Sequence, residues 1–510
     1  MYYLAYLNLK LVKILILNFR LCLYIHAIIG LPEKVFFGTG ISTIVMVLKR
    51  AKTRPDTSIL FVDASRGFEK QGKNNRLREC DIRKIVGAVT ARQEIPDFSR
   101  LVSRDTIRRN DYNLNISRYV DSSDKSEQYD IYATMFGGIP KNEILALDKY
   151  WKAFPSLLDN IFAFNEHGFA HLTQTDVAAA ISANSDVLHF CQQYEQAFAD
   201  YHQYLSNSIV QQMNTCNIQQ KHEELTSDLF HRIEPFATLA DRYQAFQFFS
   251  NEWKQIQTDL EIIQTEGNAA FNEIEIDDET DKENGKLLPF ELVQRELLPE
   301  LVADIAGKEQ RLVGIAERYN ELLESFTPDE LEKQFVNEDH TKFVATEVKK
   351  EVRRILDAIV TDDISLLRTY PSKKAEKEQF IKDNPQLPWA EIEPDKNGIY
   401  GKTQINKMIA YLQNQYDFPS DSYETKVKEV FALQQEEKQL ADRLKELRLD
   451  LLLRTRECIR TMALDTATRL IDIKWTEPLC SSLARMPEEV ISHLADKVKH
   501  IADKYATTYQ

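Results

Sequence analysis

Two glycines near the start of the sequence could form a phosphate-binding loop. They lie in VFFGTG (Val35–Gly40), between two apolar runs. A dinucleotide-binding loop has the pattern GxGxxG, follows a strand and opens a helix whose N-terminus meets the pyrophosphate. The FGTG stretch lacks the third glycine and precedes an apolar run of strand character, ISTIVMVL. The spacing therefore argues against a phosphate-binding loop.

Other chemical motifs are missing or incomplete. The sequence contains no GxSxG, no P-loop motif and no HExxH. His167 and His171 are four residues apart, but no carboxylate or thiolate at ligand spacing joins them, so we expect ordinary histidines. In IEIDDETDKENGK the position eleven after Asp277 is Leu288, where a calcium loop needs glutamate. The six cysteines are scattered without a CxxC pair. We expect no metal site and reduced thiols.

A basic segment lies within an acidic chain. The net charge of -15 argues against a uniformly basic nucleic-acid binder. Between Lys49 and Arg118, however, there are 17 Lys and Arg against 9 Asp and Glu, a local charge of +8. Such a segment either faces a polyanion or is an ordinary solvated surface, and both interpretations stay open here. If it faces DNA, we expect contacts to the phosphate backbone from Arg76, Arg78, Arg83 and Lys84.

Three short apolar runs predict β-strands. They are Ala27–Leu31, Ile41–Leu48 and Ser58–Ala64, each rich in isoleucine or valine and bounded by glycine, proline or charged residues. Their nearly continuous apolar character is typical of a sheet covered on both faces. Three strands make only part of a doubly wound sheet, so we expect the last strands at the edge of an α/β sheet.

From Asp81 onward the spacing of apolar residues is helical, which predicts a mostly α-helical remainder. An acidic stretch of low hydrophobicity, residues 274–286, is expected to be a solvated linker. The expected division is an apolar N-terminal segment, a partial α/β domain, a helical region, the acidic linker and a helical C-terminal region, with bounds 1–26, 27–125, 126–273, 274–286 and 287–510.

One long C-terminal helix is expected to have an apolar seam. Its apolar residues alternate at spacings of three and four, with Glu437 as the one polar residue in the series. This pattern predicts a coiled-coil-like helix that docks on a partner, although a helix in an ordinary bundle has the same pattern. The seam residues are Val430, Leu433, Leu440, Leu444, Leu447 and Leu451.

The first residues are strongly apolar but are interrupted by Lys10, Lys13 and Arg20. No uncharged run reaches the roughly 18 residues of a membrane-spanning helix, and no small-residue cleavage site follows. We therefore expect no membrane anchor and a cytoplasmic protein.

Seven stretches occur in a characteristic order. They are GLPEKVFFGTGISTIVMVL, ILFVDASRGFEKQGKNNRLRECDIRKIV, VSRDTIRRNDYNLNISRYVD, GGIPKNEILALDKYWKAFPSLL, PFATLADRYQAFQFFSNEW, LLPFELV and the terminal IDIKW…ADKYA. In this order they resemble the modification subunit of type I restriction enzymes, a family of adenine-N6 DNA methyltransferases. The likeness extends from about Ala27 to the C-terminus.

The resemblance implies a role for the FFGTG loop. Such enzymes extrude the adenine from the duplex and hold it against S-adenosylmethionine, the methyl donor. In related adenine methyltransferases an aromatic residue at this late motif stacks on the extruded base, and Phe36 or Phe37 matches its position. The alternative is that both phenylalanines pack against the edge of the sheet.

The resemblance also indicates what the sequence lacks. Family members have a helical N-terminal domain, a D-P-x-x-G-[ST]-G cofactor loop and an N-P-P-[FY] motif. Neither motif occurs, and the one Asn-Pro pair, Asn384 and Pro385, lies far downstream in a polar region. FFGTG matches the shorter F-x-G-x-G cofactor loop of other adenine methyltransferases, but its flanks fit the late motif better. We expect a C-terminal portion of the subunit that is catalytically incomplete and binds no S-adenosylmethionine alone.

The resemblance implies several partners. They are a specificity subunit, a restriction subunit and double-stranded DNA. A separately encoded N-terminal half, if one exists, would make the chain part of a split enzyme, and its absence would favour a relic or a docking module. Two alternatives remain open: a non-catalytic helical docking module for a specificity subunit, and a membrane-tethered helical scaffold.

Overall fold

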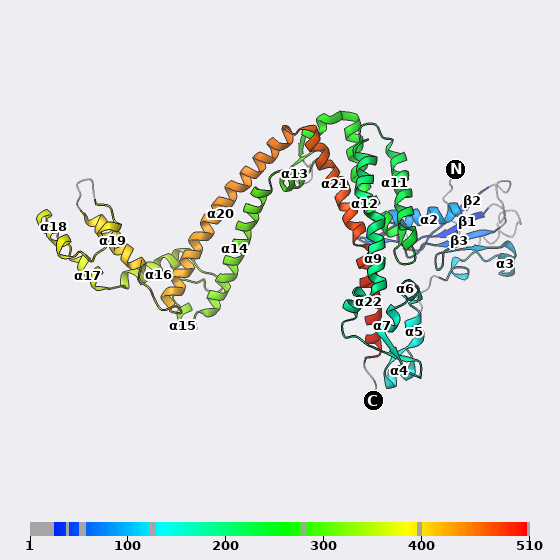
Figure 1. Cartoon of the computed structure of the whole chain (residues 1–510), viewed down its shortest axis with the longest axis horizontal. Helices are drawn as coiled ribbons and strands as arrows, with labels where there is room; N and C mark the ends of the chain where they lie inside the picture. The colour runs from blue at the N-terminus through cyan, green and yellow to red at the C-terminus, as the bar shows by residue number, and fades with distance from the viewer. Residues whose placement is uncertain are drawn as a thin grey trace. The chain divides into compact units, whose positions relative to one another are not determined.

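A computed structural model describes residues 25–36, 40–49, 58–121, 129–276, 282–394 and 400–506 of the chain (Figure 1). These residues form two compact units. The first contains the residues up to Glu273, the short segment Lys286–Leu288 and the residues from Met462 onward. The second contains Ile274–Gly285 and Pro289–Thr461. The residues from Met462 onward therefore return to the first unit, which differs from the expected continuous region 287–510.

The first unit is built on a four-stranded sheet with the order β2-β1-β3-β6. Its strands are β1 (Ile25–Gly30), β2 (Ile44–Leu48), β3 (Ile59–Asp63) and β6 (Ser99–Val102). Strand β1 runs parallel to β3 and antiparallel to β2, and β3 runs antiparallel to β6. The three predicted strands are confirmed, whereas β6 lies beyond Asp81, where helical structure was expected.

Both faces of the central strands are covered. Alternate residues of β1 and β3 pack on one side against α2 (Glu79–Ala91) and on the other against the segment of α3 (Arg104–Arg109) and η3 (Ile116–Arg118). Strand β2 is different, because Ile44 and Leu48 are 51% and 55% exposed. Its outer edge pairs with no strand among the described residues.

The rest of the first unit is mainly helical. Its longest helix, α12, packs against α2, α11 and α21. It begins where the Asp241 carboxylate accepts a hydrogen bond from Tyr243 N, and it ends at Gly267, whose φ is 74°. The elements are β4 (Glu69–Gln71), β5 (Asn74–Arg76), α4 (Ile131–Phe136), β7 (Ile139–Pro140), α5 (Lys141–Leu145), α6 (Asp148–Ala153), α7 (Leu157–Ile161), β8 (Phe162–Phe164), β9 (Phe169–Leu172), α8 (Val177–Ser182), α9 (Ser185–Phe198), α10 (Tyr201–Leu205), η4 (Ser206–Val210), α11 (Ile218–Ile233), η5 (Glu234–Phe236), α12 (Arg242–Glu266), η6 (Gly267–Asn272), α21 (Leu464–Ala484) and α22 (Met486–Lys504).

A buried ion pair joins α12 to α21. Asp259 is 0% exposed, and its carboxylate accepts hydrogen bonds from Lys474 Nζ at 2.6 Å, Trp475 Nε1 at 2.8 Å and Gln255 Nε2 at 2.8 Å. Lys474 Nζ also donates to the carbonyl oxygen of Leu287 at 2.7 Å. A buried carboxylate needs such partners because its desolvation is costly. This cluster connects residues that are more than 200 positions apart.

The second unit is organised by two long helices, α14 and α20, which lie side by side (Figure 1). Ion pairs link them, including Arg311 to Glu436 at 2.6 Å and Arg318 to Glu429 at 2.7 Å. The elements of this unit are β10 (Ile274–Ile276), β11 (Glu283–Gly285), α13 (Phe290–Leu297), α14 (Pro299–Ser325), α15 (Pro328–Leu331), α16 (Ala345–Ala358), α17 (Asp362–Arg368), α18 (Lys374–Asp383), η7 (Trp389–Glu391), α19 (Lys402–Asn414) and α20 (Tyr423–Arg460).

The predicted apolar seam is the face of α20 that packs within the chain. Val430 and Leu433 lie in one cluster with Ile315 and Leu322 of α14. Farther along, the seam continues in a cluster with Ile305 of the same helix. These seam side chains therefore pack as in a helix bundle of the same chain. A partner protein that docks on α20 would have to bind another face of the helix.

The described ends of the acidic segment 274–286 form paired strands rather than a solvated linker. Strands β10 and β11 pair antiparallel within it, with Ile274 opposite Gly285 and Ile276 opposite Glu283. Residues 277–281 lie outside the described part of the chain. Among the helices of the described residues, none is long and apolar enough to cross a membrane.

We expect the Asp259→Ala substitution to lower the free energy of unfolding by about 3–5 kcal/mol, because it leaves the Lys474 ammonium, whose side chain is only 13% exposed, without its carboxylate partner. Glu261→Ala is the matched control. Glu261 lies on the same helix and accepts a hydrogen bond from Gln257 at an exposed site, so its loss should cost less than about 0.5 kcal/mol. Urea unfolding followed by tryptophan fluorescence measures both. A loss below about 1 kcal/mol for Asp259→Ala would contradict the role of the ion pair.

Candidate functional site

The FFGTG loop leaves the sheet at an edge suited to ligand binding. Because β1 and β3 are parallel, their carboxyl ends at Gly30 and Asp63 meet at one edge of the sheet. Just beyond them, Ala64 N donates to Gly30 O at 2.9 Å. In open α/β sheets, ligands bind outside the carboxyl ends of the strands. The loop that follows Gly30 is therefore the first candidate site.

A small hairpin fixes this loop. Leu31 N donates to Thr43 O at 2.8 Å and closes the base of the loop. Asn75 on β5 holds the outer part, since its backbone N donates to Lys34 O at 3.1 Å and its Nδ2 to Glu33 O at 2.8 Å. The stretch before the phenylalanines is thus anchored to the β4–β5 hairpin.

The structure describes one of the two predicted stacking residues. Phe36 lies on the anchored loop beyond the carboxyl end of β1 and is 39% exposed. Phe37, Gly38 and Thr39 lie outside the described residues. Phe36 therefore presents part of its ring to solvent, which is compatible with stacking on a base.

Gly30 allows the sheet edge to pack closely on the covering segment. A Cβ at this position would lie 2.8 Å from Ile116 Cδ1, closer than two carbons can approach. The same segment is held by Tyr119, whose ring lies 4.5 Å from that of Phe61 and whose hydroxyl donates to Asn113 O at 2.6 Å. The NDYNLNISRYVD stretch is thus a packed cover of the sheet.

A hollow of about 1050 Å³ lies beside the end of β3. Two of the predicted DNA-contacting cations, Arg78 and Lys84, line it together with Arg66. Five carboxylates line it as well, so its charge does not favour a polyanion. These are Asp63, Asp81, Asp97, Asp121 and Asp241.

The thiol in this hollow is inactive as a nucleophile near neutral pH. The pKa of the Cys80 thiol is raised to about 11. Burial is the main cause, and the negative charge of the neighbouring Asp81 is the second. Only the thiolate is a strong nucleophile. In the described residues no group of three or more His, Cys, Asp or Glu side chains has the geometry to hold a metal ion.

The four predicted DNA-contacting cations have separate surroundings. The Arg78 guanidinium donates to the Asp81 carboxylate at 2.9 and 3.0 Å, and this hydrogen bonding raises the pKa of Arg78. Lys84 Nζ lies 4.4 Å from the centre of the Phe98 ring. Arg76 makes only a loose pair with Glu69, at 3.9 Å, with its side chain about half exposed.

Arg83 points away from the hollow and toward α11. Its guanidinium donates to both carboxylate oxygens of Glu223, at 3.2 and 3.0 Å, and this interaction lowers the pKa of Glu223. It also lies 5.6 Å from the centre of the Phe246 ring and 6.0 Å from that of Phe230. The sequence-predicted cations thus do not form one patch.

Other cations of the basic segment are more exposed. Three exposed arginines lie on or next to the α3–η3 cover: Arg108, Arg109 and Arg118. Arg108 makes a 3.8 Å ion pair with Asp105, and a hydrogen bond with the Tyr112 side chain raises the pKa of Arg108. These arginines contribute to the local charge of +8 but were not among the predicted DNA contacts. The Arg108–Arg109 pair at the end of the short helix α3 is the sequence signal that points to them.

The segment that contains this site matches a known family. Residues 21–128 match the family model described as N-6 DNA Methylase. This range includes the four-stranded sheet, the FFGTG loop, helix α2 and the α3–η3 cover. The matched segment is thus similar to part of the proteins that this family model describes.

The similar proteins are more specific. Over 108 residues the chain is 38% identical to the type I restriction enzyme MpnII methylase subunit of Mycoplasma pneumoniae, which covers 21% of this chain and 20% of the relative. Over 131 residues it is 41% identical to the type I restriction enzyme MjaVII methylase subunit of Methanocaldococcus jannaschii. This alignment covers 24% of this chain and 23% of the relative. The resemblance to the methylase subunits of type I restriction enzymes is confirmed, and the chain spans about a fifth of the length of these relatives.

A solved structure also matches. It is the type I restriction-modification system methyltransferase subunit from Streptococcus thermophilus, at 42% identity and a TM-score of 0.19, with 20% of this chain and 21% of that chain covered.

A double-mutant cycle tests whether the ion pair between Arg83 of α2 and Glu223 of α11 stabilises the chain. Arg83→Ala should destabilise the chain more than Glu223→Ala, because it removes the contacts with the Phe230 and Phe246 rings as well as the ion pair. Once Arg83 is absent, loss of Glu223 should cost nothing further. The measured coupling should be about 0.2–1 kcal/mol. Fully additive effects would show that the pair does not form in solution.

Proposed function

We propose that this chain supplies the late part of the catalytic domain of an adenine-N6 DNA methyltransferase in a type I restriction-modification complex. The complex transfers a methyl group from S-adenosylmethionine to adenine N6 in double-stranded DNA. The observation that supports this most strongly is the match of residues 21–128 to the N-6 DNA methylase family. The position of the FFGTG loop at the carboxyl edge of parallel strands agrees with it.

In this proposal Phe36, or Phe37 beside it, stacks on the adenine that leaves the duplex. Extrusion costs a few kcal/mol, and an aromatic face recovers part of that cost. The partial exposure of Phe36 and the anchoring of its loop by Asn75 support such a role. A fixed loop reduces the entropy lost when the base binds.

The sheet is proposed to be the edge portion of a larger methyltransferase sheet. Support comes from β2, whose Ile44 and Leu48 are exposed and whose outer edge pairs with no described strand. Open apolar edges favour addition of another strand. The cofactor loop and the N-P-P-[FY] motif, which the sequence lacks, would come from residues outside it, such as a separately encoded N-terminal half. The chain alone would then bind no S-adenosylmethionine and would lack the groups that position the reaction.

DNA-backbone contacts remain proposed for Arg76, Arg78, Arg83 and Lys84. Arg76 is the best placed of them, because it follows Asn75, the residue that holds the FFGTG loop, and its own ion pair is loose. Phosphate would have to compete with closer carboxylates at Arg78 and Arg83.

A second candidate function is docking on a specificity subunit, with a restriction subunit joining the same complex. The observation that favours docking is an apolar patch on α4, where Ile131 is 78% and Phe136 62% exposed. Tyr132 and Met135 on the same helix are also exposed. Exposed apolar patches on folded proteins often mark interaction sites.

The stacking role is tested with the complex isolated through a tag on this chain. Phe36→Ala should lower methyl transfer from labelled S-adenosylmethionine to DNA by about 5- to 150-fold, the equivalent of one lost base stack. Phe36→Tyr keeps an aromatic face and should keep most of the activity. If Phe36→Ala methylates DNA as fast as the unchanged chain, Phe36 does not stack on the base.

The docking role predicts a separate defect. Ile131→Glu should weaken binding of the specificity subunit at least about tenfold, because it places a carboxylate in a desolvated contact. The fold should be unaffected, since the side chain is exposed. Val313→Glu, at a 58% exposed position of α14, is the matched control and should bind normally. Pull-down with purified specificity subunit, together with circular dichroism, makes the measurement. Equal binding by both variants would exclude the α4 patch.

A further inference from the structure

Helix α4, which carries the exposed apolar patch, is too short to be stable by itself. It has six residues, and an isolated helix shorter than about 12 residues is marginal in water. Ala133 is its one buried residue, whereas four of the others expose large apolar side chains. Burial of its own side chains therefore contributes little, and contacts at the ends of the helix must keep it folded.

The N-terminal end of α4 is held by the last turn of α22. The Asp130 carboxylate caps α4, because it accepts a hydrogen bond from Ala133 N at 2.9 Å. The backbone N of the same residue donates to the Tyr505 hydroxyl at 3.1 Å, across 375 positions of the sequence. Tyr505 directly follows α22 and is only 4% exposed. The cap of α4 is thus bound to the end of the C-terminal helix.

The Tyr505 hydroxyl belongs to a buried network of three side chains. It donates to the carboxylate of Glu143 on α5. Both oxygens of this carboxylate also accept hydrogen bonds from Lys504 Nζ at 3.0 Å, and the Lys504 side chain is 8% exposed. Burial raises the pKa of Tyr505, so its hydroxyl stays protonated near neutral pH. We call Glu143, Lys504 and Tyr505 the C-terminal latch. Breaking one of its contacts leaves a buried polar group without its partner, which is costly.

Ring contacts on two sides complete the support of α4. Just before the cap, the Tyr129 ring lies 6.4 Å from the Tyr505 ring at 68°, and Lys504 Nζ lies 4.8 Å from the centre of the Tyr129 ring. On the helix itself, the Tyr132 ring stacks on Phe169 of β9 at 4.8 Å. The residues that precede α4 therefore depend on the latch, while the helix has one stacked ring as a second support.

We propose that the C-terminal latch controls whether the α4 patch is formed. With the latch closed, α4 is folded and presents its apolar side chains on one short helix. With the latch open, the Asp130 N–H loses its acceptor, and α4 unfolds locally while the rest of the first unit stays folded. A partner that binds the patch selects the closed latch and, by linkage, stabilises it. This effect on binding rests on the docking role proposed above, whereas the local unfolding of α4 does not.

Hydrogen exchange of the full chain tests the latch. Tyr505→Phe removes only the hydroxyl group. The amides of Ala133, Thr134 and Gly137, which bond to Asp130 or within α4, should exchange at least about tenfold faster, because the hydroxyl bonds to a charged group. The amides of α12 should exchange at an unchanged rate, which shows that the unit remains folded. Glu143→Gln keeps an acceptor for the hydroxyl but removes the ion pair, so it should have a smaller effect in the same direction.

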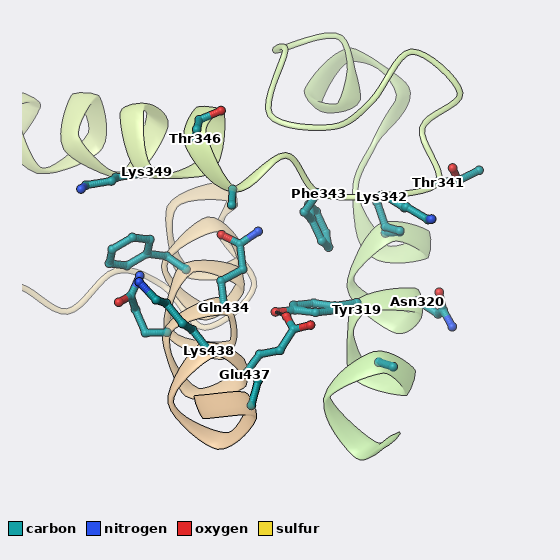
Figure 2. Close-up of a pocket in the computed structure, with 16 residues that line it drawn as sticks. Tyr319, Asn320, Thr341, Lys342, Phe343, Thr346, Lys349, Gln434, Glu437 and Lys438 are labelled. Carbon is teal, nitrogen blue, oxygen red and sulfur yellow. Dashed lines mark hydrogen bonds between the residues drawn. The ribbon is translucent and has the colours of Figure 1, made fainter. Parts of the chain in front are cut away.

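A hydrogen bond of the same kind in the second unit provides the matched control. The Tyr319 hydroxyl of α14 donates to the Glu437 carboxylate of α20 at 2.9 Å (Figure 2). Tyr319→Phe removes the same chemical group and should leave the exchange of α4 unchanged. If α4 exchanges as slowly in Tyr505→Phe as in the unchanged chain, or if Tyr319→Phe speeds it equally, the latch does not exist. If α12 exchanges faster together with α4, Tyr505 serves the general stability of the unit, and the proposal is overturned as well.

Binding of purified specificity subunit tests the link to docking. Tyr505→Phe should weaken binding several-fold although Tyr505 is buried, and Tyr319→Phe should bind normally. Weaker binding by Ile131→Glu but not by Tyr505→Phe would show that docking does not need the latch, and would overturn this link. Normal binding by both Ile131→Glu and Tyr505→Phe would contradict the docking role itself, and the exchange rates of α4 would still decide whether the latch exists.

Discussion

The first unit depends on the buried carboxylate of Asp259. This group joins α12 to α21. In the sequence, α21 comes after the whole second unit. Helix α12 is also the support of the α/β sheet, because it packs against α2 and its Gln247 accepts a hydrogen bond from Cys80 N at 3.1 Å. The position of the sheet, and with it the FFGTG loop, therefore depends on an ion pair between distant parts of the sequence.

Local patterns in the sequence were sufficient for the strands and for the apolar face of α20. The runs that contain Ile59–Asp63 and Ile44–Leu48 have strand composition, and the seam of α20 has a heptad spacing that any apolar contact requires. What covers each face was not predictable in the same way. The partner of the seam is α14, and nothing in the spacing of Leu444 and Leu447 distinguishes a helix of the same chain from one of another protein.

The candidate site shows the same limit. The sequence placed Phe36 in a loop after a strand, which the structure confirms, and its family resemblance suggested a stacking role. The anchoring of that loop by Asn75, 42 residues from Glu33, could not be read from either stretch alone. Charge was still less informative, because Arg83 is paired with Glu223, 140 residues away. A count of local charge treats such an arginine as available to DNA, whereas in the folded chain its charge is paired with a carboxylate.

The chain leaves the first unit after Glu273 and returns to it at Met462, and these two points are close together. Asn272 Nδ2 donates to Met462 O at 3.1 Å. Lys286 also holds the start of this segment in place, because it forms ion pairs with Glu266 and Glu273. The second unit is therefore an insertion whose two ends meet. A mechanical load applied at the ends of the described chain would pass through the first unit and bypass the inserted helices, which would remain slack until the contacts around Asp259 gave way. This arrangement would isolate α14 and α20 from strain in the sheet.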